Sequence, residues 1–369
     1  MIRIMQINAG SKYGGVSAMI YNYYKHIDRN RYQFDFVAPF RSSFELYREE
    51  IENMGGRIIE LGVEGTSLLY NYRLFKAVYL VCKNNKYQIV HINSGYSLFN
   101  FIVAFASHCA GATRILVHSH NAGNIKKKDR IYAKILAGSL CYLATECLAC
   151  SKAAGEFMFT KKVMCSPKFH ILKNGIVLKS FAYDEETRKK IRKSYNIENR
   201  FVVGHVGRFT EQKNHIFLLN VFAELLSYRP DAVLVLIGEG EDMNRVQSHS
   251  IELGIEKNII YAGLVKNTNE LYSAMDVFVL PSLFEGLPVV GIEAQAAGLK
   301  CVFSANVTQE VMVTPSCSMI KLDDDISNWV KEILKSNNFS RNDSIKYLQE
   351  AGYDIEDVTR KLETLYSTI

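Results

Sequence analysis

The sequence predicts an α/β protein made of two doubly wound parallel-sheet domains in series. Short apolar stretches alternate with amphipathic stretches almost throughout, and a second series of strands opens at Phe201. The length of 369 residues exceeds what one hydrophobic core normally supports, so two domains are the default.

The first half is expected to contain seven strands separated by helices. The strands are predicted at 3–7, 33–37, 57–60, 89–92, 114–117, 146–149 and 169–171, and the helices at 16–27, 43–53, 69–84, 97–110, 128–144 and 153–160. The most lipid-like run, 98–112, is shorter than the ~20 apolar residues that a membrane-spanning helix needs. We therefore expect a buried helix there.

The second half repeats the pattern after a polar, charge-rich segment. That segment, 174–199, is expected to hold the interdomain connection and a surface helix. The strands that follow are predicted at 201–206, 233–237, 259–261, 277–280 and 300–303, and a final helix is predicted at 355–368. Ligands in such sheets bind at the carboxyl ends of the strands, which is where functional side chains are sought.

The composition is that of an ordinary globular protein, and it excludes some partners. The net charge of +6 is small and dispersed, which argues against nucleic acid but suits contact with phosphates or an anionic membrane surface. The eight cysteines lie mostly in apolar runs, as free thiols of a reducing cytoplasm do. Cys147 and Cys150 form a CxxC pair that fits a buried strand better than a zinc or redox site. No signal peptide is expected ahead of the first strand.

The most informative stretch is 284–294, where Glu285 and Glu293 stand eight residues apart. A strand precedes it, Gly286 and Leu287 form a turn, and a helix is expected from Pro288 onward. Free N–H groups at a helix N-terminus suit phosphate, and carboxylates suit the hydroxyl groups of a sugar. Together they indicate a nucleotide sugar, although two carboxylates biasing a helix N-terminus remain the alternative.

Three further groups are expected at strand ends in the second half. After 201–206, Arg208 is suited to grip a phosphate in a bidentate manner and Lys213 adds a point charge, with a solvated turn holding one salt bridge as the alternative. Gly238 permits a tight turn and close backbone approach after the second strand. Val265 follows the third strand, where backbone groups could meet a base edge. Ordinary loops remain the alternatives for the last two.

The first half contributes two more candidates. Gly14 and Gly15 link the first strand to the first helix and allow close backbone approach, without forming the dinucleotide fingerprint. His118 and His120 end a buried strand. No third ligand supports a zinc pair, so His118 is expected to be structural and His120 to contact a reacting group.

Two runs of charged residues, one basic and one acidic, each have a structural and a functional interpretation. The basic run Lys126–Arg130 is expected on a solvated face, with docking on an anionic membrane or a lipid-linked acceptor as the functional alternative. Asp323, Asp324 and Asp325 precede a helix, so an acidic cap explains them better than a metal does.

The chain resembles the family 4 glycosyltransferases, the retaining group with the GT-B fold, across nearly its whole length. Within that family it is similar to the bacterial exopolysaccharide and capsule branch. The segments that carry the resemblance are the E-x7-E pair Glu285 and Glu293, Gly14-Gly15, His120, Asn174-Gly175-Ile176, Gly207-Arg208 with Lys213, and 274–286.

The resemblance implies two Rossmann-like domains facing an interdomain cleft. They would be an acceptor-binding domain at 1–178, a nucleotide-sugar-binding domain at 179–350, and a C-terminal helix at 351–369 that crosses back onto the first domain. It implies transfer of a sugar, with retention, from a UDP-sugar to a glycan or polyprenyl-linked acceptor, without a metal or other cofactor. The enzyme would be cytoplasmic, with peripheral membrane contact.

The resemblance also assigns roles to the candidates. The catalytic group would be His120, Glu285, Arg208 and Lys213, and donor-binding residues would be Gly14, Gly15, Arg208, Lys213, Gly238, Val265, Glu285, Gly286, Leu287 and Glu293. Glu293 would take the ribose and Glu285 the sugar end. A nucleotide-sugar epimerase of the same fold and a non-catalytic sugar-binding protein of capsule assembly are the alternatives.

Overall fold

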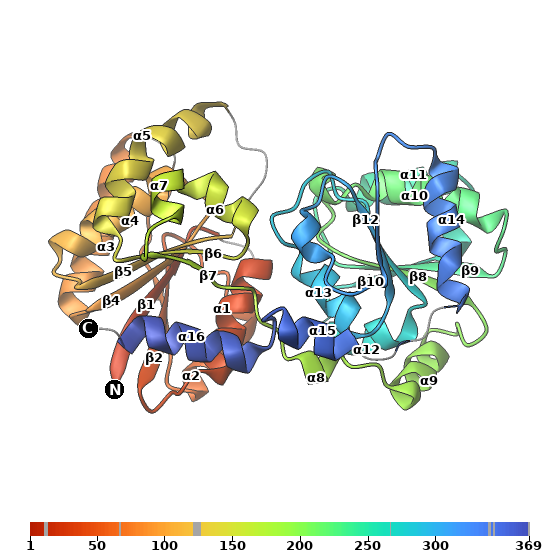
Figure 1. The fold of residues 1–369 in the computed structure, drawn as a ribbon, viewed down its shortest axis with the longest axis horizontal. Coiled ribbons are helices and arrows are strands. Elements are labelled where there is room, and N and C mark those ends of the chain that lie inside the picture. Colours follow the sequence, from red (N-terminus) through yellow and green to blue (C-terminus); the bar gives the residue numbers. More distant parts are fainter. Residues whose placement is uncertain are drawn as a thin grey trace. The chain divides into compact units, whose positions relative to one another are not determined.

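The computed structural model describes residues 1–10, 14–65, 68–120, 127–265, 267–338, 341 and 344–367, and the side chains of these except 127–134, 337 and 338. The chain forms two compact units, drawn in Figure 1. One comprises Met1–Ile176 together with Ile355–Ile369, and the other comprises Val177–Asp354. The domain limits expected from the sequence were 178 and 350.

The N-terminal unit is a seven-stranded parallel sheet in the order β3-β2-β1-β4-β5-β6-β7. Its strands are β1 Ile2–Asn8, β2 Tyr32–Ala38, β3 Arg57–Glu60, β4 Ile89–Asn93, β5 Arg114–Ser119, β6 Glu146–Ala149 and β7 Phe169–Ile171. Its helices are α1 Gly15–His26, α2 Arg48–Asn53, α3 Leu68–Asn85, α4 Ser97–Cys109, α5 Lys127–Leu143, α6 Lys152–Met158, α7 Lys161–Met164 and α16 Ile355–Ser367. The C-terminal helix α16 thus belongs to the N-terminal unit, as predicted.

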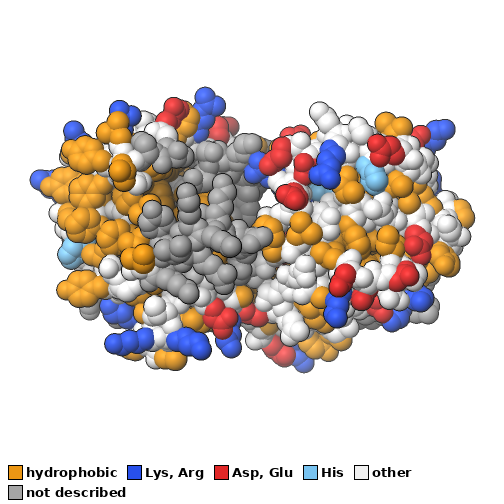
Figure 2. All heavy atoms as spheres, turned by 90° about the horizontal axis from the view of Figure 1, so that it is seen from above, with side chains coloured by type: hydrophobic (Ala, Val, Ile, Leu, Met, Phe, Trp, Pro, Cys, Tyr) orange, Lys and Arg blue, Asp and Glu red, His pale blue; other side chains and the backbone are white. Residues whose placement is uncertain are grey.

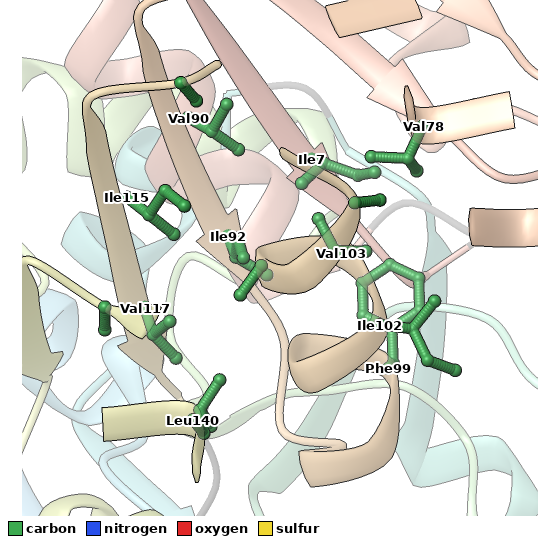
Figure 3. Close-up of a cluster of buried hydrophobic side chains, with 14 of the residues drawn as sticks. Ile7, Val78, Val90, Ile92, Phe99, Ile102, Val103, Ile115, Val117 and Leu140 are labelled. Atoms are coloured by element: carbon green, nitrogen blue, oxygen red, sulfur yellow. The ribbon is translucent and has the colours of Figure 1, made fainter. Parts of the chain in front are cut away.

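One face of this sheet packs a hydrophobic core under α3, α4 and α5. Figure 3 shows Ile7, Ile92 and Val117 of the strands pointing toward Val103 and Leu140 of the helices. Successive residues of a strand point to opposite faces, so Gln6, His91 and His118 lie on the other side of the sheet. Those polar side chains are nevertheless buried, because α16 covers them.

The C-terminal unit is a six-stranded parallel sheet in the order β10-β9-β8-β11-β12-β13. Its strands are β8 Phe201–Val206, β9 Ala232–Ile237, β10 Ile259–Gly263, β11 Val277–Leu280, β12 Lys300–Ser304 and β13 Cys317–Ile320. Its helices are α8 Leu178–Phe181, α9 Glu185–Ser194, α10 His215–Leu226, α11 Met243–Glu252, α12 Thr268–Ala274, α13 Val289–Ala296, α14 Ile326–Leu334 and α15 Ser344–Glu350. The second, third and fourth strands in space are buried throughout, as expected for a sheet with helices on both faces.

The structure differs from the sequence-based prediction in a few places. The helix expected at 43–53 divides into a 3-10 turn at Glu45–Tyr47 and the short α2, and β13 and α7 were not predicted. The predicted surface helix is α9, but its Arg192 is buried against Asp276. The CxxC pair belongs to β6 and the residue after it, and none of the eight cysteines, which all lie in the described part of the chain, is in a disulfide. Among the described residues, no helix is both long enough and apolar enough to span a membrane.

Candidate active site

The strand order of the C-terminal unit places its candidate site between β8 and β11. The order runs outward from these two neighbours in opposite directions, which makes them the topological switch point of the sheet. The loops after the two strands are joined, because the Leu283 N–H donates to the Gln212 carbonyl at 2.8 Å. The Gln212 side-chain amide donates in return to the Phe284 carbonyl at 2.9 Å. These two hydrogen bonds hold the loops together at the carboxyl edge of the sheet.

Two predicted site residues meet at this edge. The Lys213 ammonium lies 2.6 Å from Oε1 of Glu285, and the Ser282 hydroxyl donates to the same oxygen at 3.1 Å. The side chains of Lys213 and Glu285 are only 15% and 11% exposed. Lys213 ends the 3-10 turn Glu211–Lys213 that follows β8, and Asn214 then adopts a left-handed conformation (φ 57°) before α10. That turn aims Lys213 across the switch point.

Arg208 is directed elsewhere in the structure. Its guanidinium lies 3.0 Å from Glu241, which follows β9, and both side chains are largely exposed. An exposed ion pair of this kind contributes little to stability, so Arg208 can exchange its partner at low cost. In the structure, Arg208 therefore forms the solvated salt bridge that was the alternative interpretation of this turn. Its contact with phosphate stays a prediction.

Gly238 is required by close backbone packing at the carboxyl ends of β8 and β9. Its φ of 134° is unfavourable for other residues, and a Cβ there would lie 2.2 Å from the Gly207 carbonyl oxygen. Its N–H donates to the Gly263 carbonyl at 2.9 Å, and the Gly207 N–H donates to Ile237. The close backbone approach at Gly238 ties the ends of three strands together.

Glu293 lies on α13 and has a partner that the sequence did not suggest. The Tyr272 hydroxyl of α12 donates to its Oε2 at 2.8 Å. Burial raises the pKa of Glu293 to about 7, and the Tyr272 hydrogen bond acts in the opposite direction. The carboxyl group therefore titrates near neutral pH.

Leu287 is buried just before Pro288, which caps the helix, and Val265 is partly buried after β10.

Two buried histidines beneath Lys213 were missed by sequence reasoning. His205 of β8 bonds through Nδ1 to the Val279 carbonyl at 2.8 Å, and its ring lies 4.7 Å from that of His215. Burial lowers the pKa of His205 to about 4 and that of His215 to about 2. Both rings are therefore neutral beneath the lysine. For His205 the sequence signal was a polar residue inside a buried strand, whereas His215 begins α10.

The N-terminal unit carries its candidates at its own switch point, between β1 and β4. Gly14 precedes α1, and no described protein atom lies within 4 Å of where a Cβ of Gly14 or Gly15 would stand. His120 follows β5, with Nε2 3.1 Å from Oδ1 of Asn93, the last residue of β4. Lys126 and the side chains of 127–130 lie outside the described residues.

The acidic run before α14 includes a helix cap. Asp325 caps α14 by accepting from the Ser327 N–H at 2.8 Å, as predicted. Across the described part of the chain, no three His, Cys, Asp or Glu side chains are grouped so that they could hold a metal ion.

A basic cavity of about 680 Å³ lies at the opposite edge of the C-terminal sheet, where β8 and β12 begin. Its arginines have structural partners. Arg188 donates to the Ser273, Ala274 and Met275 carbonyls at the end of α12, and Arg188 and Arg192 share Asp276. These cations neutralise a helix C-terminus, so the cavity is distinct from the candidate site.

Two doubly wound units with polar loops at their switch points define a two-domain α/β protein of the GT-B type. Residues 13–180 match the family model Glycosyltransferase Family 4, and residues 187–349 match Glycosyl transferases group 1. EpsF of Bacillus subtilis, which is named provisionally as a glycosyltransferase, is 31% identical over 99% of this chain and 96% of its own. The chain therefore belongs to the family 4 glycosyltransferases and is a glycosyltransferase.

Other relatives and solved structures agree with this assignment. A capsular polysaccharide biosynthesis glycosyltransferase of Staphylococcus aureus, CapH, is 26% identical over 99% of both chains. An Escherichia coli enzyme named UDP-Gal:alpha-D-GlcNAc-diphosphoundecaprenol alpha-1,3-galactosyltransferase is 30% identical over 64% of this chain and 63% of its own. The structure of Anabaena Alr3699/HepE with UDP-glucose has a TM-score of 0.80 over the full length of both chains at 16% identity, which supports the fold.

Proposed function

We propose that this glycosyltransferase moves a sugar, with retention, from a UDP-sugar to a glycan or polyprenyl-linked acceptor in the synthesis of a bacterial surface polysaccharide. The observation that carries the proposal is the contact of Lys213 with Glu285 across the switch point of the C-terminal sheet. Donors for a diphosphate and acceptors for sugar hydroxyls stand there side by side.

The charges at this point suit a diphosphate donor. A largely buried ion pair is costly unless both charges are satisfied, and Lys213 has Glu285 as its partner. A bound diphosphate offers Lys213 a second anion, and Arg208 is exposed enough to join it. Together they would stabilise the charge that develops on the leaving phosphate, with no metal ion required.

The two glutamates would recognise the two ends of the donor. Glu285, next to Lys213, would accept from sugar hydroxyls, and Glu293 would accept from the ribose. A carboxylate suits both tasks because it only accepts hydrogen bonds. Gly238 and Val265 close strands β9 and β10 near the nucleoside end, while Gly14, Gly15 and His120 would serve the reacting end. Retention would follow from attack on the face that the phosphate leaves.

Peripheral membrane contact would suit a lipid-linked acceptor. Figure 2 shows hydrophobic side chains gathered on one face of the N-terminal unit, and α3, α4 and α5 expose large apolar residues. These are Leu68, Leu69, Tyr72, Leu80, Phe105, Ile135 and Tyr142. Exposed apolar side chains that gather on one face are typical of interaction surfaces. The names of CapH and of the galactosyltransferase above support a polysaccharide or a diphosphoundecaprenol acceptor.

The proposal is tested by incubating the full-length protein with a panel of UDP- and GDP-sugars. Donor hydrolysis and thermal stabilisation are read for each, followed by transfer to a polyprenyl-diphosphate sugar. We expect stabilisation and turnover with one or more UDP-sugars. Epimerised donor without release of UDP would favour the epimerase, and stabilisation without turnover would favour the non-catalytic protein. Stabilisation by a nicotinamide dinucleotide alone would refute the proposal.

A further inference from the structure

The sheet face under α16 carries a connected set of buried polar side chains. Gln6 of β1 is in register with His91 of β4, and Asn93 of β4 is in register with His118 of β5. All four are nearly inaccessible to solvent. Burying such groups is costly unless each one is hydrogen-bonded, so a hydrophobic face would be the simpler solution for packing a helix. The arrangement of their hydrogen bonds is therefore informative.

The hydroxyl group of Tyr366 joins two branches of this network. Tyr366 lies near the end of α16, and its ring is buried. Its hydroxyl oxygen lies 2.8 Å from Nε2 of Gln6 and 2.7 Å from Nδ1 of His91. One branch continues through Gln6, and the other through His91.

The first branch determines which ring nitrogen of His120 carries the proton. Nδ2 of Asn93 faces two oxygens, Oε1 of Gln6 at 2.9 Å and the His91 carbonyl at 3.3 Å, so this atom is the amide nitrogen. Oδ1 of Asn93 therefore faces Nε2 of His120 at 3.1 Å and can only accept. Burial lowers the pKa of His120 to about 3, so the ring is neutral and has a single N–H. That N–H is on Nε2.

In the second branch, hydrogen bonds are donated from Gln6 through Tyr366 and His91 toward His118. Gln6 uses Oε1 toward Asn93, so its Nε2 donates to the Tyr366 oxygen. The single O–H of Tyr366 is then available for Nδ1 of His91. His91 is neutral and carries its proton on Nε2, which lies 3.3 Å from Nδ1 of His118. The His118 ring in turn lies 4.0 Å from the His120 ring.

We propose that Tyr366 is a positioning residue for His120. Through Gln6 and Asn93 its hydroxyl holds His120 as the Nε2–H tautomer. Through His91 and His118, whose ring packs against that of His120, it supports the position of the ring. The lone pair of Nδ1 is left available, and this buried atom has no hydrogen-bond partner among the described residues.

The consequence for chemistry rests on the proposed function, in which His120 serves the reacting end. An Nδ1 lone pair accepts a hydrogen bond from a hydroxyl group, whereas the other tautomer would present an N–H there. The C-terminal helix would thereby act on the reaction without contacting a substrate. A loosened network would slow the chemical step and leave donor binding largely unchanged.

The direct test is nuclear magnetic resonance of the full-length protein labelled with 15N-histidine. Long-range proton–nitrogen correlations report which ring nitrogen carries the proton, and His120→Gln assigns the His120 signals. We expect the Nε2–H tautomer in the unaltered protein and a mixture of tautomers at His120 in Tyr366→Phe. An Nδ1–H tautomer in the unaltered protein, or unchanged His120 signals in Tyr366→Phe, would overturn the proposal.

Tyr32→Phe is the matched control. Tyr32 is equally buried, its ring lies 5.7 Å from that of Tyr366, and its hydroxyl bonds to the Glu363 carbonyl rather than to the histidines. Tyr32→Phe should leave the His120 signals unchanged. If Tyr366→Phe does not fold, Gln6→Met cuts the first branch alone and should alter His120 while His91 keeps its Nδ1 hydrogen bond. Unaltered His120 signals in folded Gln6→Met would contradict the proposal.

The kinetic readout separates positioning from general destabilisation. We expect kcat for sugar transfer to fall about tenfold in Tyr366→Phe, with KM for the donor within about twofold and Tyr32→Phe near the unaltered rate. A rise in donor KM at constant kcat would contradict the proposal. Because the tautomer measurement needs no turnover, a protein that transfers no sugar would refute the proposed function and leave the hydrogen-bond network to be judged separately.

Discussion

The ammonium group of Lys213 lies 2.6 Å from the Glu285 carboxylate, although 72 residues separate them in the sequence. The contact exists because β8 and β11 are neighbours in the sheet while their loops come from different parts of the chain. It places a cation for phosphate next to a carboxylate for hydroxyls at the switch point.

Lys213→Ala should lower donor turnover at least a hundredfold, since a preorganised cation near a developing charge typically contributes that much. Lys213→Arg, which keeps the charge, should retain a measurable part of the rate. Steady-state kinetics with the active UDP-sugar measures both. The control is Lys189→Ala, which removes an exposed lysine from its ion pair with Glu186 on α9 and should leave the rate unchanged. Equal losses in Lys213→Ala and Lys189→Ala would argue against the site.

Glu293 should make the unliganded protein less stable as pH rises from about 4.5 to about 7. Burial raises the folded-state pKa to about 7 from the ordinary 4.5, so the folded protein holds a proton that the unfolded chain has lost. The difference reaches about 3 kcal/mol at most. Urea unfolding of the unaltered protein and of Glu293→Gln across this range measures their free energies of unfolding. The difference between the two free energies should change with pH, as the unaltered protein loses stability relative to Glu293→Gln. A difference in free energy of unfolding that stays constant across this range would contradict a raised pKa for Glu293.

The same carboxyl group should affect donor binding with the opposite sign. Only the ionised form offers acceptors on both oxygens to the ribose hydroxyls, so donor affinity should increase as pH rises through about 7. The Tyr272 hydroxyl favours that ionised form, and Tyr272→Phe should move the midpoint to higher pH. Titration of UDP at a series of pH values measures the midpoint. A midpoint that is identical in Tyr272→Phe would contradict the role given to this hydrogen bond.

His215 should destabilise the protein in acid. Burial lowers its pKa to about 2 from the ordinary 6.5, so between these values the unfolded chain binds a proton at this residue and the folded protein does not. Stability from this group is complete above pH 6.5 and is lost as pH falls below that value. His215→Phe, which keeps an aromatic ring stacked on Phe209, should unfold at a lower pH than the unaltered protein. An acid transition at the same pH in both would refute this reasoning.

Gly238→Ala should destabilise the C-terminal unit by more than about 2 kcal/mol, because a Cβ would lie 2.2 Å from the Gly207 carbonyl and the φ of 134° is unfavourable. Gly254→Ala is the matched control. Gly254 also has a positive φ, 68°, but no atom of the described residues beyond its chain neighbours lies within 4 Å of its Cβ position, so about 1 kcal/mol is expected there. Chemical unfolding of both variants gives the comparison. Similar losses would mean that backbone conformation alone matters at Gly238.

The sequence predicted the alternation of strands and helices because most strands carry unbroken apolar runs. It failed at β13, Cys317–Ile320, whose pairing with β12 provides a stability that four residues of weak strand propensity do not indicate. It also predicted one helix over 43–53, where the structure has a 3-10 turn and the short α2, with Phe44 and Ile51 both buried. Local pattern does not contain such long-range packing.

The candidate site was predictable in its residue types but not in its pairing. Lys213, Glu285 and Glu293 could be singled out because they follow strands or begin a helix. Their partners could not, because Tyr272 and Ser282 have no distinctive spacing. Likewise, the polar positions of Gln6 and His91 would fit a solvated sheet face equally well. Only the return of α16, with Tyr366 some 275 residues from His91, shows that this face is covered.

The most direct test of the account is the binding of UDP to the full-length protein by titration calorimetry. We expect binding by the unaltered protein, weakening of at least tenfold in Glu293→Ala and in Lys213→Ala, and unchanged binding in Lys189→Ala. Absence of UDP binding by a folded protein, or equal affinity in all four proteins, would contradict the placement of the donor site at the carboxyl ends of β8 and β11.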